Sequence, residues 1–295
     1  MAGIHVQEIS SAVARLCMEA NYYLPDDIRH SLEAAVVKES SPIGKDILKA
    51  LLRNAAIAAE QQIPICQDCG MVVVFVEFGQ DVCIEGGFLT DAINDGVREG
   101  YQRGYLRASV VRDPFQRRNT GDNTPAVIHY DVVPGHELRI TIAPKGFGSE
   151  NMSGLKMLRP ADGLPGVKRY VLEAVGQAGG NPCPPMVVGV GVGGTMEQAA
   201  LLAKKALVRS LAQPNPVAAL RQLETDLCHE INDLGIGPQG FGGATTVLGV
   251  NVEVFPTHIA GLPVAVNIGC HATRSRSIIL VGESIQRKGG ECSNG

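Results

Sequence analysis

The 295-residue sequence has no tryptophan, and aromatic residues make up only 4% of it. It has no long run of Lys or Arg, and its formal net charge is −4. Its apolar stretches are interrupted by Gly or Pro before they reach the roughly 20 residues that a membrane-spanning helix requires. We therefore expect neither nucleic acid nor a membrane as a partner.

The first ten residues, MAGIHVQEIS, also lack the basic segment and apolar run of a secretory signal. The eight cysteines are then expected in a reducing compartment, by default the cytoplasm. In that compartment metal binding or catalysis is a more common use of cysteine than a disulfide.

Apolar residues make up 45% of the chain and charged residues 19%, which is typical of a globular protein. The sequence shows no internal repeat and no long linker. We therefore predict one domain over residues 1–286, followed by a disordered tail at 287–295.

Periodicity predicts a mixed α/β fold, in which a helical N-terminal region packs on mixed β-sheet elements. Ser41-Pro42 is typical of an N-cap and first helical residue, and it predicts a helix to about residue 60. A turn at Pro134-Gly135 is expected to join two strands. The predicted strands are 71–78, 126–133, 138–143, 186–192, 245–254, 264–268 and 277–281.

Three cysteines lie where predicted elements end, beside Pro or Gly. Cys66 follows a helix, Cys183 precedes a buried strand, and Cys270 ends another strand. Loops held by a rigid scaffold often carry binding residues, and widely spaced thiolates can meet on one iron-sulfur cluster. Spacing alone leaves the other interpretation open, because a free cysteine is often a small buried apolar residue.

Cys66 and Cys69 also form a CxxC pair, which could be a redox dithiol or half of a zinc site. No thioredoxin-like pattern surrounds the pair, and no second ligand pair lies nearby in the sequence. We therefore interpret Cys69 as a structural residue.

Residues 189–194 match the glycine pattern of a dinucleotide site, GxGxxG, between a strand and a helix. The acidic residue that would end a second strand is missing, so the match is weak. Segments 107–111, 117–125 and 145–151 combine basic or amide side chains with glycine, which favours an anion site. His258 lies just beyond a predicted strand, where a core or surface role remains the simpler interpretation.

Six segments in order resemble the alpha subunit of the two-subunit class I fumarate hydratases, which are iron-sulfur hydro-lyases. The resemblance covers about residues 10–285. L-tartrate dehydratase alpha subunits share the three cysteine contexts, whereas NTGDNTP and GSENMS are more similar to the fumarase branch. The segments are ICQDCG, RRNTGDNTPAVIH, KGFGSENMS, NPCPPMVVGVGVGGT, IGPQGFGG and PTHIAGLPVAVNIGC.

The resemblance implies a 4Fe-4S cluster held by three thiolates, with an open iron that acts as a Lewis acid on a small dicarboxylate substrate. The implied reaction interconverts (S)-malate and fumarate plus water, a reaction of the tricarboxylic acid cycle. It implies Asp68 and His258 as catalytic residues. The implied metal ligands are Cys66, Cys183 and Cys270, and the implied substrate-binding residues are Gln67, Arg107 and Gly146.

The chain departs from the family pattern at two positions: Cys69 stands where Thr is usual, and Phe147 where a third Gly is common. Single-chain relatives carry a further C-terminal domain that completes the site. The resemblance therefore implies a separate beta subunit as partner. The alternatives are an L-tartrate dehydratase alpha subunit, which would convert tartrate to oxaloacetate, and a non-catalytic iron-sulfur or zinc-binding interaction protein.

Overall fold

The computed structural model describes residues 2–284 and divides the chain into two units, each containing helices and strands. The first unit comprises Met1–Asn21, Cys69–Pro144 and Ser275–Gly295, and the second comprises Tyr22–Asp68 and Lys145–Arg274. The predicted mixed α/β class is confirmed. The single domain over 1–286 stays a prediction, and the predicted tail at 287–295 lies outside the described residues.

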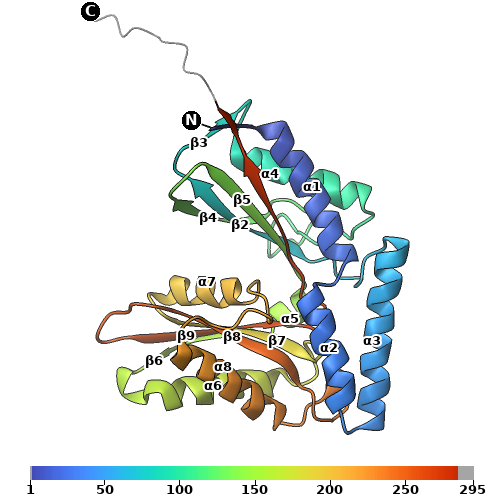
Figure 1. The fold of residues 1–295 in the computed structure, drawn as a ribbon, viewed down its shortest axis with the longest axis vertical. Coiled ribbons are helices and arrows are strands. Elements are labelled where there is room, and N and C mark those ends of the chain that lie inside the picture. The colour runs from blue at the N-terminus through green and yellow to red at the C-terminus, as the bar shows by residue number, and fades with distance from the viewer. Residues whose placement is uncertain (1, 285–295) are drawn as a thin grey trace, which may run out of the picture. The chain divides into compact units, whose positions relative to one another are not determined.

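The first unit contains a three-stranded and a four-stranded sheet (Figure 1). Its elements are β1 (Ala2–His5), α1 (Val6–Tyr22), β2 (Met71–Gly79), β3 (Val82–Glu85), α4 (Leu89–Arg103), β4 (Val127–Val133), β5 (Glu137–Lys145), β10 (Arg276–Val281) and β11 (Glu283–Ser284). The strand orders are β11-β1-β3 and β10-β5-β2-β4. The Pro134-Gly135 turn connects β4 to β5, but β2 lies between these two strands, so they form no hairpin ladder.

The second unit carries one four-stranded sheet with the order β6-β9-β7-β8. Strand β7 pairs in parallel with β8 and antiparallel with β9. The strands are β6 (Gly154–Leu158), β7 (Met186–Gly193), β8 (Val247–Phe255) and β9 (Leu262–Gly269). The helices are α2 (Asp26–Lys38), α3 (Pro42–Gln61), α5 (Phe147–Glu150), α6 (Gly163–Ala178), α7 (Met196–Ala206) and α8 (Ala218–Asn232), with 3-10 turns at Pro160–Asp162 and Pro238–Gly240.

Both faces of this sheet are covered by helices. Strands β7 and β9 are buried along nearly their whole length, as continuous apolar runs require. Figure 1 shows α6 and α8 on one face and α7 on the other. The core on the α6 and α8 face is built largely from Val, Leu and Ile, including Val171, Val188, Leu227, Val252 and Ile268.

The glycine pattern of β7 has a packing explanation. A Cβ atom at Gly189 would collide with the carbonyl oxygen of Ala203, and one at Gly191 with that of Ala199. Both carbonyls belong to α7, so the two glycines allow this helix to approach the strand closely. Helix–strand packing therefore accounts for these two glycines of the GxGxxG match.

The local signals placed α3 accurately. Ser41 is the N-cap, its Oγ accepts the Gly44 N–H at 3.1 Å, and Pro42 is the first helical residue. Helices α4 and α6 were not predicted, because glycines interrupt their apolar patterns.

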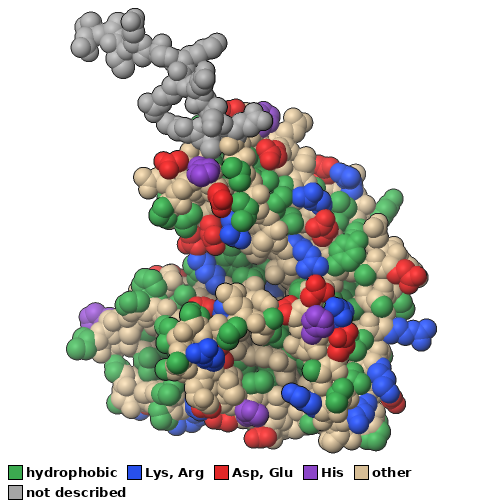
Figure 2. All heavy atoms as spheres, in the orientation of Figure 1, with side chains coloured by type: hydrophobic (Ala, Val, Ile, Leu, Met, Phe, Trp, Pro, Cys, Tyr) green, Lys and Arg blue, Asp and Glu red, His purple; other side chains and the backbone are tan. Residues whose placement is uncertain are grey.

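Within residues 2–284, no helix combines the length and the apolar character needed to span a membrane. Acidic and basic side chains are interspersed on the face drawn in Figure 2.

A buried carboxylate, Glu39, joins α2 to the segment before β8. Its side chain accepts the N–H groups of Ser40, Ser41 and Ala244 on Oε1 and that of Thr245 on Oε2, each at 2.9 Å. Burial alone would raise the pKa of Glu39, but these donors hold it below its usual value. The ionised side chain therefore stabilises the fold.

We expect Glu39→Gln to lower the free energy of unfolding by about 2 kcal/mol at neutral pH, because an amide replaces a charged acceptor of several N–H groups. The folded pKa is lowered, so this stabilisation is complete above the ordinary carboxyl pKa and is lost as the pH falls through the lowered value. Urea unfolding at several pH values measures the difference, with the exposed Glu33→Gln as control. A difference that does not shrink in acid would contradict this account.

Candidate active site

The three predicted cysteine ligands lie in the second unit and meet at one end of its sheet. Cys183 precedes β7 and Cys270 follows β9. Because Val187 pairs with Gly269 in the antiparallel ladder, the start of one strand lies beside the end of the other. The His271 N–H also donates to the Cys183 carbonyl, at 3.4 Å. The sheet itself therefore brings two thiols together.

Cys66 reaches the same place from the C-terminal end of α3. The side chain of Asn54 on α3 donates to the Ile65 carbonyl at 2.8 Å. Ile65 is buried in a small apolar cluster with two alanines of α3 and with Ala272, and both Cys66 and Cys270 pack against this cluster. Three segments distant in sequence thus carry three thiols to one location.

The electrostatics of the thiols agree with this placement. Burial raises the pKa of Cys66 and of Cys183, and proximity to the other thiols of the set raises it further. The Arg274 guanidinium opposes this for Cys66. None of the three forms a disulfide within the described residues. Neutral thiols in the metal-free fold would lose their protons on binding metal.

Thiolates are the ligands that iron-sulfur clusters use, so the chemistry of the three cysteines fits such a cluster. Among the described residues, no group of three or more His, Cys, Asp or Glu side chains is placed to hold one metal ion. In a cluster each thiolate binds a different iron, so the sulfur atoms stand further apart than the ligands of one ion. The three converging thiols would supply three such ligands, beside the buried cation Arg274.

Asp68, two residues after Cys66, is held at two points. Its Oδ2 accepts the Phe147 N–H at 2.8 Å, and its backbone carbonyl accepts from the Arg274 guanidinium at 2.8 Å. A Cβ atom at Gly146 would stand 3.2 Å from the same Oδ2, so glycine permits this close approach. The structure therefore brings Asp68 and Gly146 together.

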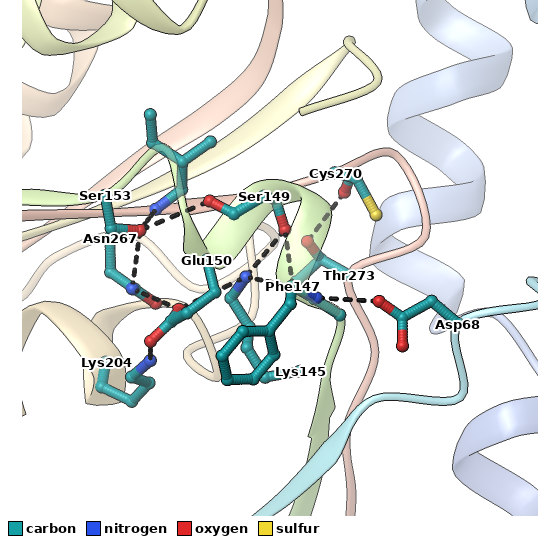
Figure 3. Close-up of polar contacts among 12 residues, drawn as sticks. Asp68, Lys145, Phe147, Ser149, Glu150, Ser153, Lys204, Asn267, Cys270 and Thr273 are labelled. Carbon is teal, nitrogen blue, oxygen red and sulfur yellow. Dashed lines mark hydrogen bonds and ion pairs between the residues drawn. The ribbon is translucent and has the colours of Figure 1, made fainter. Parts of the chain in front are cut away.

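Figure 3 shows how this turn is connected to β9. Lys145 contacts Glu150, whose carboxylate also pairs with Lys204 of α7 and accepts from Asn267 at 2.8 Å. Burial alone would raise the pKa of Glu150, but these donors lower it below its usual value. Asn267 lies three residues before Cys270. A charged network thus links the Asp68 turn to a cysteine-bearing strand.

The other predicted residues lie differently. Gln67 is exposed, and its Oε1 accepts from the Cys66 thiol at 3.3 Å. Arg107 is exposed and belongs to the first unit, where its backbone N–H donates to the buried Cys69 thiol at 3.1 Å. The Cys69 sulfur is therefore an acceptor inside the first unit.

His258 lies in the exposed turn between β8 and β9, and its Nδ1 accepts the Ala260 N–H at 3.2 Å. Strand β9 separates it from Cys270, and eight residues at about 3.3 Å each span roughly 25 Å. The second unit therefore does not bring His258 to the cysteines of its own chain.

Sequence reasoning missed Asn267 and Arg274, and it noted Lys145 and Glu150 only as part of an anion-binding loop. Asn267 and Glu150 stand inside motifs that were singled out for other residues. Arg274 follows Cys270 by four positions without a recognisable motif. His271, beside Cys270, has its pKa lowered by burial, and its Nδ1 lies 3.1 Å from the Cys183 carbonyl oxygen.

The exposure of the thiols predicts an order of alkylation in metal-free protein. Cys183 is exposed, Cys66 and Cys270 are half-buried, and Cys17 and Cys69 are buried. We expect iodoacetamide to modify Cys183 first and the two buried thiols only on unfolding, because thiolate formation and access control the rate. Peptide mass spectrometry measures the order. Labelling of Cys17 as fast as that of Cys183 would refute it.

Comparison with known proteins identifies the family. The family model described as Fumarate hydratase (Fumerase) matches residues 10–279. A Methanocaldococcus jannaschii protein named "Putative L(+)-tartrate dehydratase subunit alpha" is 44% identical over 273 residues, which cover 90% of this chain and 95% of that protein. The L(+)-tartrate dehydratase subunit alpha of Escherichia coli O157:H7 is 34% identical over 281 residues, covering 93% and 91%. The chain belongs to the fumarate hydratase family and is a hydro-lyase chain.

Proposed function

We propose that this chain is the alpha subunit of an iron-sulfur hydro-lyase that interconverts (S)-malate and fumarate plus water. Family membership gives the reaction class. The observation that carries the proposal is the convergence of Cys66, Cys183 and Cys270 from three segments at one end of the second sheet. A scaffold that needed only buried apolar residues there would not require three thiols.

The three thiolates would hold three irons of a 4Fe-4S cluster. When bound, the cluster supplies a Lewis acid that assists the departure of the substrate hydroxyl. The Arg274 guanidinium, which is 5% exposed, favours the thiolate form of Cys66. The chain therefore provides both the ligands and a nearby positive charge for an anionic group.

Asp68 is the residue we assign to proton transfer, because its carboxylate is oriented by the Phe147 N–H beside the cysteine end of the unit. Gln67 and Gly146 lie on the two segments that meet there, and we assign them to substrate binding. A carboxylate held by a backbone donor keeps one orientation while it exchanges a proton, as general acid-base catalysis requires.

The substrate that we propose is one of two small 2-hydroxy dicarboxylic acids, malate or L(+)-tartrate. The NTGDNTP and GSENMS segments favour malate. The names of the relatives from M. jannaschii and E. coli favour L(+)-tartrate, which the enzyme would convert to oxaloacetate. We retain malate as the primary proposal and tartrate as the second candidate.

We propose a separate beta subunit as partner, since the relatives are named as alpha subunits and this chain covers more than nine-tenths of the two described above. The beta subunit would complete the site. From the family resemblance we assign Arg107 to carboxylate binding and His258 to substrate contact. Because β9 separates His258 from Cys270, His258 would make this contact away from the cysteines of its own chain. The free thiols of the described residues suit a reducing compartment, and we propose the cytoplasm.

Ligand substitution tests the iron-sulfur site directly. After anaerobic reconstitution we expect close to four irons and four sulfides in the wild type, and a large loss of both in Cys66→Ser, Cys183→Ser and Cys270→Ser. Cys228→Ser, at a half-buried thiol on α8, is the matched control and should keep the wild-type content. One zinc ion or no metal, with all four variants alike, would overturn the hydro-lyase proposal.

Kinetics of the reconstituted alpha-beta complex decide the substrate. We expect kcat/KM for malate to exceed that for L(+)-tartrate, and we expect Asp68→Asn to lower kcat by at least about 100-fold with the iron content unchanged. The alpha chain alone should be inactive. A preference for tartrate would select the second candidate. A fully loaded complex that converts neither acid and shows no substrate-dependent spectral change would support a non-catalytic interaction protein instead.

A further inference from the structure

Lys145 is an unusually enclosed lysine at the start of the turn that contacts Asp68. Its side chain is 12% exposed, whereas lysine is almost always at the surface. Burial lowers the pKa of Lys145 to about 8, while the neighbouring Glu150 and Cys270 oppose this change. The fold therefore keeps a desolvated amine here at a cost, which is typical of a functional position.

The Lys145 amine bonds to the 146–149 turn and pairs with Glu150, which follows it. Its Nζ donates to the Gly146 carbonyl at 3.2 Å and to the Ser149 Oγ at 2.7 Å, and it lies 3.5 Å from Glu150 Oε2 (Figure 3). An ammonium group has three N–H donors, and these three acceptors match them. Two hydrogen bonds and one ion pair thus engage the ammonium group with residues 146–150, so we expect any effect of Lys145 on the reaction to pass through this turn.

The 146–149 turn also holds the carboxylate of Asp68. The amide that donates to Asp68 Oδ2 belongs to Phe147, the residue after the carbonyl that Lys145 binds. The Ser149 Oγ, bonded to Lys145, also donates to the Gly146 carbonyl at 3.3 Å. Rotation of the peptide unit between Gly146 and Phe147 would break the bonds of both Lys145 and Asp68.

The other side of the turn is fastened to β9. Asn267 donates to Glu150 at 2.8 Å and to the Ser153 Oγ at 3.0 Å, and the Ile268 N–H donates to the same Oγ at 3.0 Å. These residues immediately precede Cys270. The turn is thus anchored to one cysteine-bearing segment and contacts the other through Asp68.

We propose that Lys145 is a positioning residue, which holds the 146–149 turn so that its backbone orients the Asp68 carboxylate for the reaction. This inference rests on the proposed function, in which Asp68 transfers a proton. It adds a residue that acts through another and touches no reacting atom.

Lys204 provides a matched control. It pairs with the same Glu150 carboxylate but comes from α7, and its amine bonds to Glu150 and not to residues 146–149. Removing either lysine deletes one positive charge next to Glu150. Only the removal of Lys145 also deletes the bonds to the Gly146 carbonyl and the Ser149 hydroxyl.

We expect Lys145→Met, in the loaded alpha-beta complex, to lower kcat about 10- to 100-fold with KM changed less than about 3-fold, since a small misplacement of a catalytic group costs this much. Iron and sulfide content should stay at the wild-type level. Hydrogen exchange of the peptide that contains Phe147 should accelerate in Lys145→Met. Lys204→Met should change neither kcat nor this exchange by more than about 3-fold.

The proposal is overturned if Lys145→Met leaves kcat and the Phe147 peptide unchanged, or if both lysine variants lose activity equally. If Lys145→Met does not fold, Lys145→Gln, which keeps one polar donor, takes its place in the same measurements. If the wild type converts neither acid, the proposed function fails, and exchange alone then decides whether Lys145 holds the turn. If the hydrogen exchange of the Phe147 peptide is also unchanged in Lys145→Met, the proposal that Lys145 holds the turn is overturned as well.

Discussion

The antiparallel pairing of β7 with β9 is the constraint on which the candidate site depends. It places the start of β7 beside the end of β9. Cys183 and Cys270 are therefore neighbours, although 87 positions of the sequence separate them. The glycines of β7 serve the same arrangement, because they let α7 lie against the sheet without displacing the strands. Cys66 needs no such register, since α3 carries it to the same apolar cluster.

Gathering three thiols at one place has an electrostatic consequence. Burial and mutual proximity raise the pKa of Cys66 and Cys183, so the metal-free site favours protonated sulfur, while metal requires thiolate. The Arg274 guanidinium reduces that conflict at Cys66, and its bond to the Asp68 carbonyl fastens the segment that carries Cys66. One buried cation therefore serves both the charge and the geometry of the site.

Local signals in the sequence predicted what local physics decides. Ser41 and Pro42 predicted the start of α3 because a cap and a proline act within one turn of helix. The Pro134-Gly135 turn was placed correctly, yet β2 lies between the strands it connects, since strand order is decided by pairing at long range. The cysteines stood out because they lie at the ends of predicted elements.

The Glu150–Asn267 bond joins residues 117 positions apart, and no local pattern encodes such a contact. His258 precedes Cys270 by few residues, but an extended strand carries the two apart.

The polar network around Glu150 connects the segments to which we assign metal binding with the carboxylate to which we assign proton transfer. Asp68 follows Cys66 by two residues, and Asn267 precedes Cys270 by three, so both cysteine segments end in contacts to the same 145–153 loop. The Glu150 carboxylate carries three partners, and loss of one of them leaves a partly buried charge still paired with the others. The bonds from Lys145 to the turn have no such substitute. A displacement of the Cys66 segment would move Asp68 directly, and a displacement of the Cys270 segment would reach its carboxylate through the turn to which Lys145 is bonded. In the site that we propose, the orientation of the acid therefore depends on both cysteine segments.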